Sequence, residues 1–135
     1  MKRWVAMLAL LALVWAVMVS IALIFLPIYT GVSRSSANPE PVTAGATLIQ
    51  VNGYWVLILM AVPIALSGLG VVAAIRILRN RSYGIHLLWM AAVALAILVF
   101  IAGFSIGTFY APSALLMLVS AVLATKATPP APQDV

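Results

Sequence analysis

The feature of this sequence that most constrains its fold is an apolar run over 85–107, which carries no formal charge. A helix over these residues would be about 34 Å long at about 1.5 Å per residue, enough to cross a hydrocarbon core of about 30 Å. In the whole chain, 66% of residues are hydrophobic and 7% are charged, too few to give a soluble domain of 135 residues a polar surface. The sequence therefore predicts a polytopic membrane protein.

Three further apolar runs complete a predicted set of four helices in one transmembrane domain, residues 1–127. The predicted fold is an all-α membrane protein, a four-transmembrane-helix bundle. The first run follows Lys2 and Arg3 and is longer than the roughly 7–15 apolar residues of a signal peptide, which favours an uncleaved helix over that alternative. The fourth run is short, so a re-entrant segment is the alternative to a full crossing. The expected helices cover 4–26, 54–78, 85–108 and 111–127, and the proline-rich residues 128–135 are expected to form a disordered cytoplasmic tail.

The longest polar segment, 28–53, separates the first two helices. Glycine, serine, asparagine and proline interrupt any helix there, and β-prone runs at 28–30 and 47–51 flank them. These runs suggest a small β-hairpin over the mouth of the bundle. Asn52 is a candidate N-cap of the following helix.

The basic residues indicate the orientation of the chain in the membrane. With four crossings, Arg34 falls on one side and six basic residues fall on the other. Because cytoplasmic loops carry an excess of lysine and arginine, this predicts a multi-pass membrane protein with both termini cytoplasmic. Dispersal of these charges between apolar runs argues against a nucleic-acid partner. The six residues are Lys2, Arg3, Arg76, Arg79, Arg81 and Lys126.

Aromatic side chains at the ends of the expected spans agree with this topology. Tryptophan and tyrosine suit the headgroup zone, where the ring is buried and the polar tip is hydrated. The aromatic residues at these positions are Trp4, Tyr29, Tyr54, Trp55, Tyr83 and Tyr110.

Small residues and one proline suggest how the helices pack. Gly103 and Gly107 form a G-x-x-x-G spacing that lets two helix backbones approach closely, either inside the monomer or at an oligomer interface. Gly70 and Ala74 form a second such pair. Pro63 lies inside the second span and is expected to bend it.

The sequence offers little chemistry for catalysis or transport. It has no cysteine, and the spans contain no ionisable side chain of the kind that relays protons or couples ions. The single histidine, His86, is interpreted as interfacial rather than as a metal or haem ligand. We therefore expect no catalytic residue, metal ligand or cofactor. The serines of the spans belong to different helices and predict no ring or ladder; they are Ser20, Ser67, Ser105, Ser113 and Ser120.

Three stretches resemble a group of small bacterial four-helix integral membrane proteins that have no assigned activity. They are Val51-Asn-Gly-Tyr-Trp55, Val62-Pro63 and the segment from Gly103 through Tyr110 and Pro112 to Leu115. The resemblance covers about residues 48–123, and it implies the four-helix architecture and a bacterial plasma membrane but no catalytic residue.

These observations favour a non-enzymatic accessory, scaffold or interaction subunit. The lipid bilayer is one expected partner, and further copies of the chain or a larger membrane complex are the others. The alternative is a component of a channel or transporter that lacks its own ion-coupling residue. A membrane enzyme acting on lipid or quinone is a third hypothesis, weakened because His86 and Glu40 would lie on opposite faces of the membrane.

Overall fold

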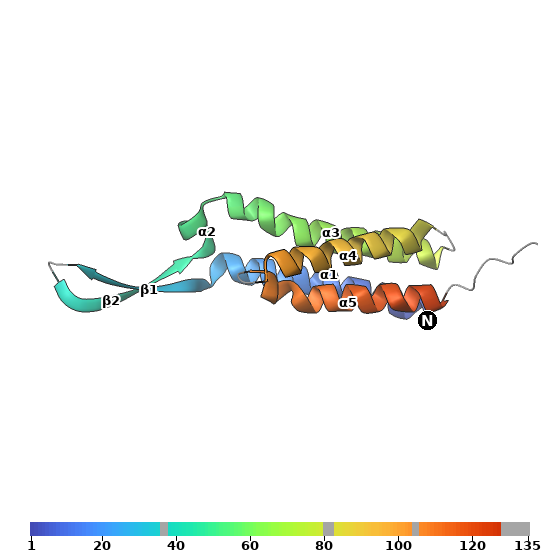
Figure 1. Cartoon of the computed structure of the whole chain (residues 1–135), viewed down its shortest axis with the longest axis horizontal. Helices are drawn as coiled ribbons and strands as arrows, with labels where there is room; N and C mark the ends of the chain where they lie inside the picture. The colour runs from blue at the N-terminus through green and yellow to red at the C-terminus, as the bar shows by residue number, and fades with distance from the viewer. Residues whose placement is uncertain (36–37, 80–82, 104–105, 128–135) are drawn as a thin grey trace, which may run out of the picture.

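The computed structural model describes residues 1–35, 38–79, 83–103 and 106–127. Four long helices run side by side, and a β-hairpin with a short helix joins the first to the second (Figure 1). This confirms the predicted all-α, four-transmembrane-helix bundle. The long helices are α1 (Lys2–Phe25), α3 (Trp55–Leu78), α4 (Tyr83–Ile101) and α5 (Gly107–Ala127).

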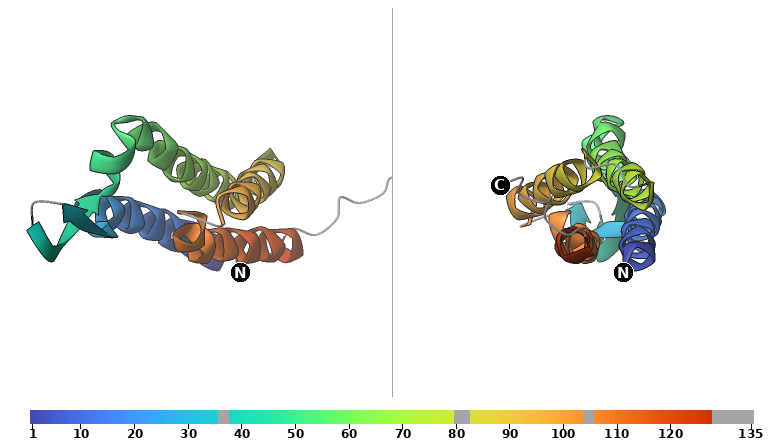
Figure 2. Two further views of the ribbon diagram at one scale, coloured as in Figure 1. Left: turned by 60° about the vertical axis from the view of Figure 1, so that its left-hand side comes forward. Right: turned by 90° about the vertical axis from the view of Figure 1, so that its right-hand side faces the viewer.

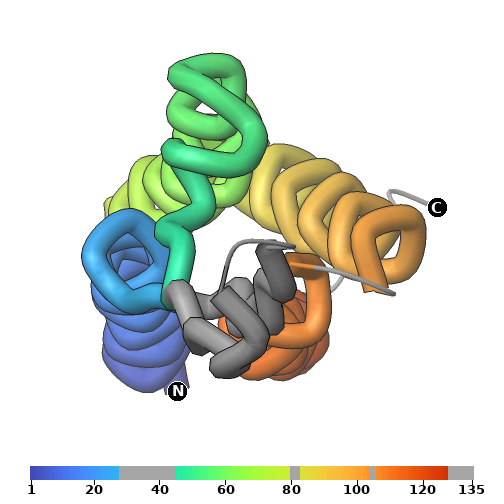
Figure 3. Tube along the Cα trace, turned by 90° about the vertical axis from the view of Figure 1, so that its left-hand side faces the viewer, coloured from blue at the N-terminus to red at the C-terminus, as the bar shows by residue number. Residues whose placement is uncertain are grey.

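The helices form a ring in which chain neighbours are also spatial neighbours. Helix α1 packs against α3 and α5, and α4 packs against the same two helices from the opposite side (Figures 2 and 3). This is the up-down-up-down arrangement that short connections favour. It places the start of α1 and the end of α5 at one end of the bundle, opposite the hairpin (Figure 1).

Each long helix is able to cross a membrane by length and composition. The shortest, α4, has 19 residues, and the longest have 24. At about 1.5 Å per residue these lengths correspond to roughly 28–36 Å, which matches a hydrocarbon core of about 30 Å. The chain is a multi-pass membrane protein.

A seam of small side chains fills the centre of the bundle. On α3, seven of the eight buried positions alternate in steps of four and three residues, a period of 3.5 that is typical of left-handed helical bundles, and the eighth is Ala73. Across the four long helices, most buried positions are alanine, glycine or serine, so the backbones approach closely. Large apolar side chains face outward toward lipid. The α3 seam consists of Val56, Met60, Pro63, Ser67, Gly70, Ala74 and Ile77.

The boundary between the last two helices differs from the prediction. The helix expected over 85–108 ends at Ile101, and the helix expected over 111–127 begins at Gly107. The chain reverses through hydrogen bonds from the amide of Gly107 to the carbonyl of Ala102 (2.8 Å) and from the Thr108 hydroxyl to the carbonyl of Gly103 (2.7 Å). This lengthens α5 to 21 residues, about 32 Å, so its length is sufficient for a full crossing.

The G-x-x-x-G interpretation is therefore wrong, because Gly103 and Gly107 do not lie on one helix. A Cβ at Gly107 would lie 2.7 Å from the carbonyl oxygens of both Ala102 and Val99. Glycine is needed here because α5 starts directly against the last turn of α4, and not because two helices cross.

The connection after α1 contains strands β1 (Pro27–Ser35) and β2 (Asn38–Thr47), which pair antiparallel. They project away from the helices along the long axis rather than folding over the mouth of the bundle (Figure 1).

The strand expected over 47–51 is instead the short helix α2 (Leu48–Asn52). Thr47 and Gln50 form a capping box, with the Thr47 amide donating to Gln50 Oε1 (2.9 Å) and the Gln50 amide donating to Thr47 Oγ1 (3.4 Å). The T-x-x-Q spacing in the sequence is typical of such a helix start. Asn52 ends α2, where its side chain donates to the carbonyl of Leu48 (3.4 Å), so it does not cap α3.

Candidate functional site

Basic side chains gather at the end of the bundle opposite the hairpin. Lys2 and Arg3 open α1, Arg76 and Arg79 close α3, and Lys126 lies in the last turn of α5. The up-down-up-down order brings these helix ends together (Figure 1). Arg81, the sixth residue of the predicted cytoplasmic set, lies outside the described residues, as do Ser105 and the predicted tail.

Two buried serines form a ladder between α1 and α5. Ser113 Oγ donates to the carbonyl of Ala12 (2.8 Å), and Ser120 Oγ donates to the carbonyl of Val5 (2.9 Å). The donors are seven residues apart on α5 and the acceptors are seven apart on α1, so the same contact repeats after two helical turns. The prediction that the serines form no ring or ladder concerned an ion path, and it did not anticipate these bonds between helices.

A third helix joins this ladder through Ser67 on α3. Its hydroxyl lies 3.3 Å from that of Ser113. Because the single Ser113 proton is donated to Ala12, Ser67 is the donor in this pair. One buried chain of hydrogen bonds thus links α3, α5 and α1.

Tyr110 makes a comparable contact nearer the hairpin. Ser20 Oγ donates to the carbonyl of Ala16 (2.8 Å) and lies 2.7 Å from the Tyr110 hydroxyl, so the tyrosine donates to the serine. Tyr110 is 4% exposed, which contradicts its predicted place in the headgroup zone. It lies in the first turn of α5, but its ring points into the bundle.

Helix α5 takes part in all of these interhelical bonds, and in two more from tryptophans. Trp15 Nε1 donates to the carbonyl of Phe109 (3.0 Å), and Trp89 Nε1 donates to Thr125 Oγ1 (3.0 Å). Within the described residues, no buried side-chain nitrogen or oxygen lacks a hydrogen-bond partner. The polar groups of the core thus hold α5 against its neighbours.

Glycines allow the closest contacts of α3. Gly70 is buried, and a Cβ there would overlap the thioether of Met117 on α5, which fills the notch that the glycine leaves. Ala74, its predicted companion, is fully buried in the central cluster. A Cβ at Gly84 on α4 would lie 2.9 Å from the carbonyl oxygen of Ala73 and 2.7 Å from Ile77 Cγ1. The sequence analysis missed Gly84, because no small residue lies four positions before or after it.

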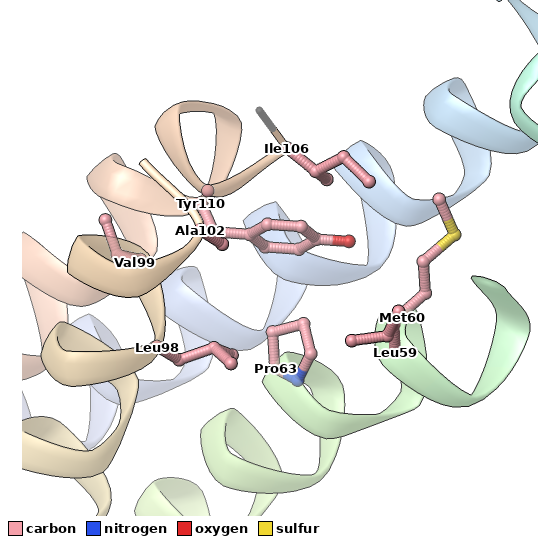
Figure 4. A pocket seen from close by; sticks show the side chains of 9 residues that line it. Leu59, Met60, Pro63, Leu98, Val99, Ala102, Ile106 and Tyr110 are labelled. Atoms are coloured by element: carbon pink, nitrogen blue, oxygen red, sulfur yellow. The ribbon is translucent and has the colours of Figure 1, made fainter. Parts of the chain in front are cut away.

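A cavity of about 180 Å³ lies between α3, α4 and the start of α5, toward the hairpin (Figure 4). Its lining is almost entirely apolar. Pro63, the predicted helix-bending residue, forms part of the wall, and α3 continues past it to Leu78. The lining residues are Leu59, Met60, Pro63, Leu98, Val99, Ala102, Ile106, Gly107 and Tyr110.

His86 lies in the first turn of α4, exposed at the end of the bundle opposite the hairpin. Among the described residues, no three His, Cys, Asp or Glu side chains come together in a way that could hold a metal ion.

The fold and these sites define a multi-pass helical membrane protein with a hydrogen-bonded core and an apolar cavity between its helices. Comparison with protein-family models, with curated proteins and with solved structures finds no significant match.

Proposed function

We propose that this chain is a non-enzymatic accessory or interaction subunit of a bacterial inner membrane. One observation carries the proposal: within the described residues, every buried polar side-chain atom is already hydrogen-bonded inside the protein. A transported ion or polar substrate needs convergent groups that can replace its hydration shell. The hydroxyls of Ser67, Ser113 and Ser120 instead hold helices together.

The hairpin is the surface that such a subunit offers to a partner outside the bilayer. It extends beyond the helix ends, and β1 and β2 form a sheet of two strands in the described chain (Figure 1). A two-stranded sheet has backbone N–H and C=O groups along both outer edges, which a partner strand or loop can bind. The helix exteriors are apolar and suit lipid, further copies of the chain, or the helices of a larger complex.

A photo-crosslinking amino acid in the hairpin tests this role. Incorporated at Val32 or Val42 in cells, it should give a discrete protein adduct, and the adduct should form again with the purified partner. The matched control is Met18, a 65% exposed position on the lipid-facing side of α1, which should give lipid adducts. Hairpin positions that yield only the adducts seen at Met18 would contradict the proposal.

The proposed orientation has both termini in the cytoplasm and the hairpin outside, on the basis of the six-to-one distribution of basic residues. Single cysteines can be introduced at Ser36, Ser82 and Gln133 of this cysteine-free chain and treated with an impermeant maleimide on intact cells. We expect labelling at Ser36 alone. Labelling at Ser82 or Gln133 without Ser36 would reverse the orientation, and labelling at Ser36 and Gln133 would make α5 re-entrant.

A channel or transporter component is the second candidate, and Pro63 is the feature that favours it. Proline provides no N–H for the carbonyl of Leu59, and both residues line the cavity. Purified protein in liposomes with a trapped pH-sensitive dye and an imposed potential should give no flux above empty liposomes. Flux that disappears in the Pro63→Ala variant would favour this second function over the first.

A further inference from the structure

We propose that the cavity between α3, α4 and α5 binds the end of a phospholipid acyl chain from the leaflet on the hairpin side. The proposal does not depend on the accessory role or on which side of the membrane the hairpin occupies. It depends on the polarity and volume of the cavity, its depth in the membrane and its access from lipid.

The cavity is suited to an apolar occupant. Its single hydroxyl, on Tyr110, donates its proton to Ser20 and is not free to donate to a ligand. An apolar protein cavity of about 150 Å³ stays dry and binds benzene-sized molecules. The cavity here, at about 180 Å³, is slightly larger and equally unsuited to water. An apolar chain inside it would supply the van der Waals contacts that the lining side chains lack in an empty cavity.

The depth of the cavity matches acyl chains rather than headgroups. Pro63 is the ninth residue of α3 counted from the hairpin side. At about 1.5 Å per residue it lies roughly 12 Å along the helix, while one leaflet contributes about 15 Å of a hydrocarbon core of about 30 Å.

The cavity also has an opening toward lipid. Leu59, one of its lining residues, is 60% exposed and is shared with a shallow apolar groove along the outer side of α3, formed with Trp55, Ile58 and Val62. The inner end is closed by Met60 and Tyr110, each 4% exposed (Figure 4). A chain lying in the groove can therefore turn inward past Leu59.

Two other occupants fit less well. A quinone ring would bury carbonyl groups against walls that offer no free donor. A helix from a second copy is about 10 Å wide, too wide for a cavity of this volume.

Photolabelling from the bilayer tests the proposal on the full chain. The protein is placed in phosphatidylcholine nanodiscs that contain a lipid with a diazirine on its acyl chain, and labelled residues are mapped by mass spectrometry. Met60 and Tyr110 should be labelled although both are buried from bulk lipid. Met117, fully buried outside the cavity, is the negative control, and Met90, 66% exposed, is the positive control. Labelling of Met90 without Met60 or Tyr110 would overturn the proposal.

Two variants make the result specific to the cavity. Ala102→Phe fills it from the corner between α4 and α5, and Leu59→Trp narrows the opening at an exposed position that tolerates bulk. Either change should abolish labelling of Tyr110 and leave Met90 labelled, while Val93→Phe on the lipid-facing side of α4 should change neither. Unaltered Tyr110 labelling in both cavity variants would refute the site. Loss of Tyr110 labelling on adding a short-chain benzoquinone, but not on adding unlabelled phosphatidylcholine, would assign a ring ligand instead.

Discussion

The α1–α5 and α3–α4 interfaces join antiparallel helices of similar length in different ways. Between α1 and α5, serine hydroxyls reach backbone carbonyls across a seam of alanines, as Ser113 does to Ala12. The contact between α3 and α4 depends on shape: Gly84 lies directly against the backbone of α3 near Ala73, and farther along, at Pro63 and Leu98, the cavity separates the two helices.

The difference shows two ways in which helices associate in lipid. Hydrophobic burial gives little drive there, since lipid tails are as apolar as leucine, so close packing and hydrogen bonds hold helices together. The α1–α5 interface has close packing and hydrogen bonds along its length. The α3–α4 interface has a close glycine contact at one end and a cavity at the other, and a cavity between helices is where a lipid chain can enter.

The largest expected effect comes from blocking the glycine contact of α3 with α4. In the Gly84→Ala variant the new Cβ meets the Ala73 carbonyl and Ile77, and overpacking of this kind costs about 3 kcal/mol at the upper end of its range. Gly68→Ala is the matched control, because a Cβ there meets nothing within 4 Å. In helices, replacing glycine by alanine otherwise stabilises by roughly 0.5–1 kcal/mol, so the two changes should have opposite signs. Unfolding in mixed detergent micelles measures both, and equal effects would contradict the close contact at Gly84.

An effect of similar size is expected at the corner that joins α4 to α5. Gly107→Ala should also destabilise by about 3 kcal/mol, because its Cβ meets the carbonyl carbon of Ala102 at 2.5 Å and the carbonyl oxygens of Ala102 and Val99 at 2.7 Å. Gly103→Ala should cost less, since its nearest contact is the Val99 carbonyl oxygen at 3.1 Å. If instead both variants change oligomeric state in size-exclusion chromatography without a difference in stability, the two glycines serve an interface between copies.

The α1–α5 side should respond to loss of its central serine. Ser113→Ala removes the bond to Ala12 and leaves the Ser67 hydroxyl without its acceptor, so we expect about 1.5 kcal/mol, near the maximum measured for interhelical hydrogen bonds in membranes. A double-mutant cycle with Ser67→Ala isolates their coupling. Additive effects would mean that α3 is not connected to the ladder through these hydroxyls.

The smallest expected effect is at Tyr110→Phe. The change removes the bond to Ser20 but keeps the ring that lines the cavity, and Ser20 retains its own bond to Ala16. A loss of about 0.6 kcal/mol is the average for such bonds in membranes. Photolabelling of residue 110 should persist in this variant; loss of the label would mean that the hydroxyl, rather than the ring, attracts the occupant.

The number of long apolar helices could be predicted from the sequence, whereas the end of α4 could not. Hydropathy is summed over a window of many residues, so it does not locate a change of chain direction inside an apolar run. The run 85–107 is equally apolar whether or not the chain turns after Ile101. The corner is held by contacts such as that from the Thr108 hydroxyl to the Gly103 carbonyl, which a sum of hydropathy does not register. The turn at Thr47 differs, because its capping box is a pattern of two residues, Thr47 and Gln50, that can be read from the sequence. The sequence analysis overlooked it.

The sequence by itself determined the properties that depend on composition and order along the chain. These are four membrane-spanning segments, small residues within them, and basic residues that an even number of crossings brings to one end. The tertiary structure alone decided which side of each helix faces inward, because a helix that is apolar all round carries no polar face to mark its exterior. It paired Ser120 with Val5 and Ser113 with Ala12, more than one hundred residues apart in sequence. It turned Tyr110 inward and left the cavity beside Pro63, since both depend on how neighbouring helices fit together rather than on any one segment.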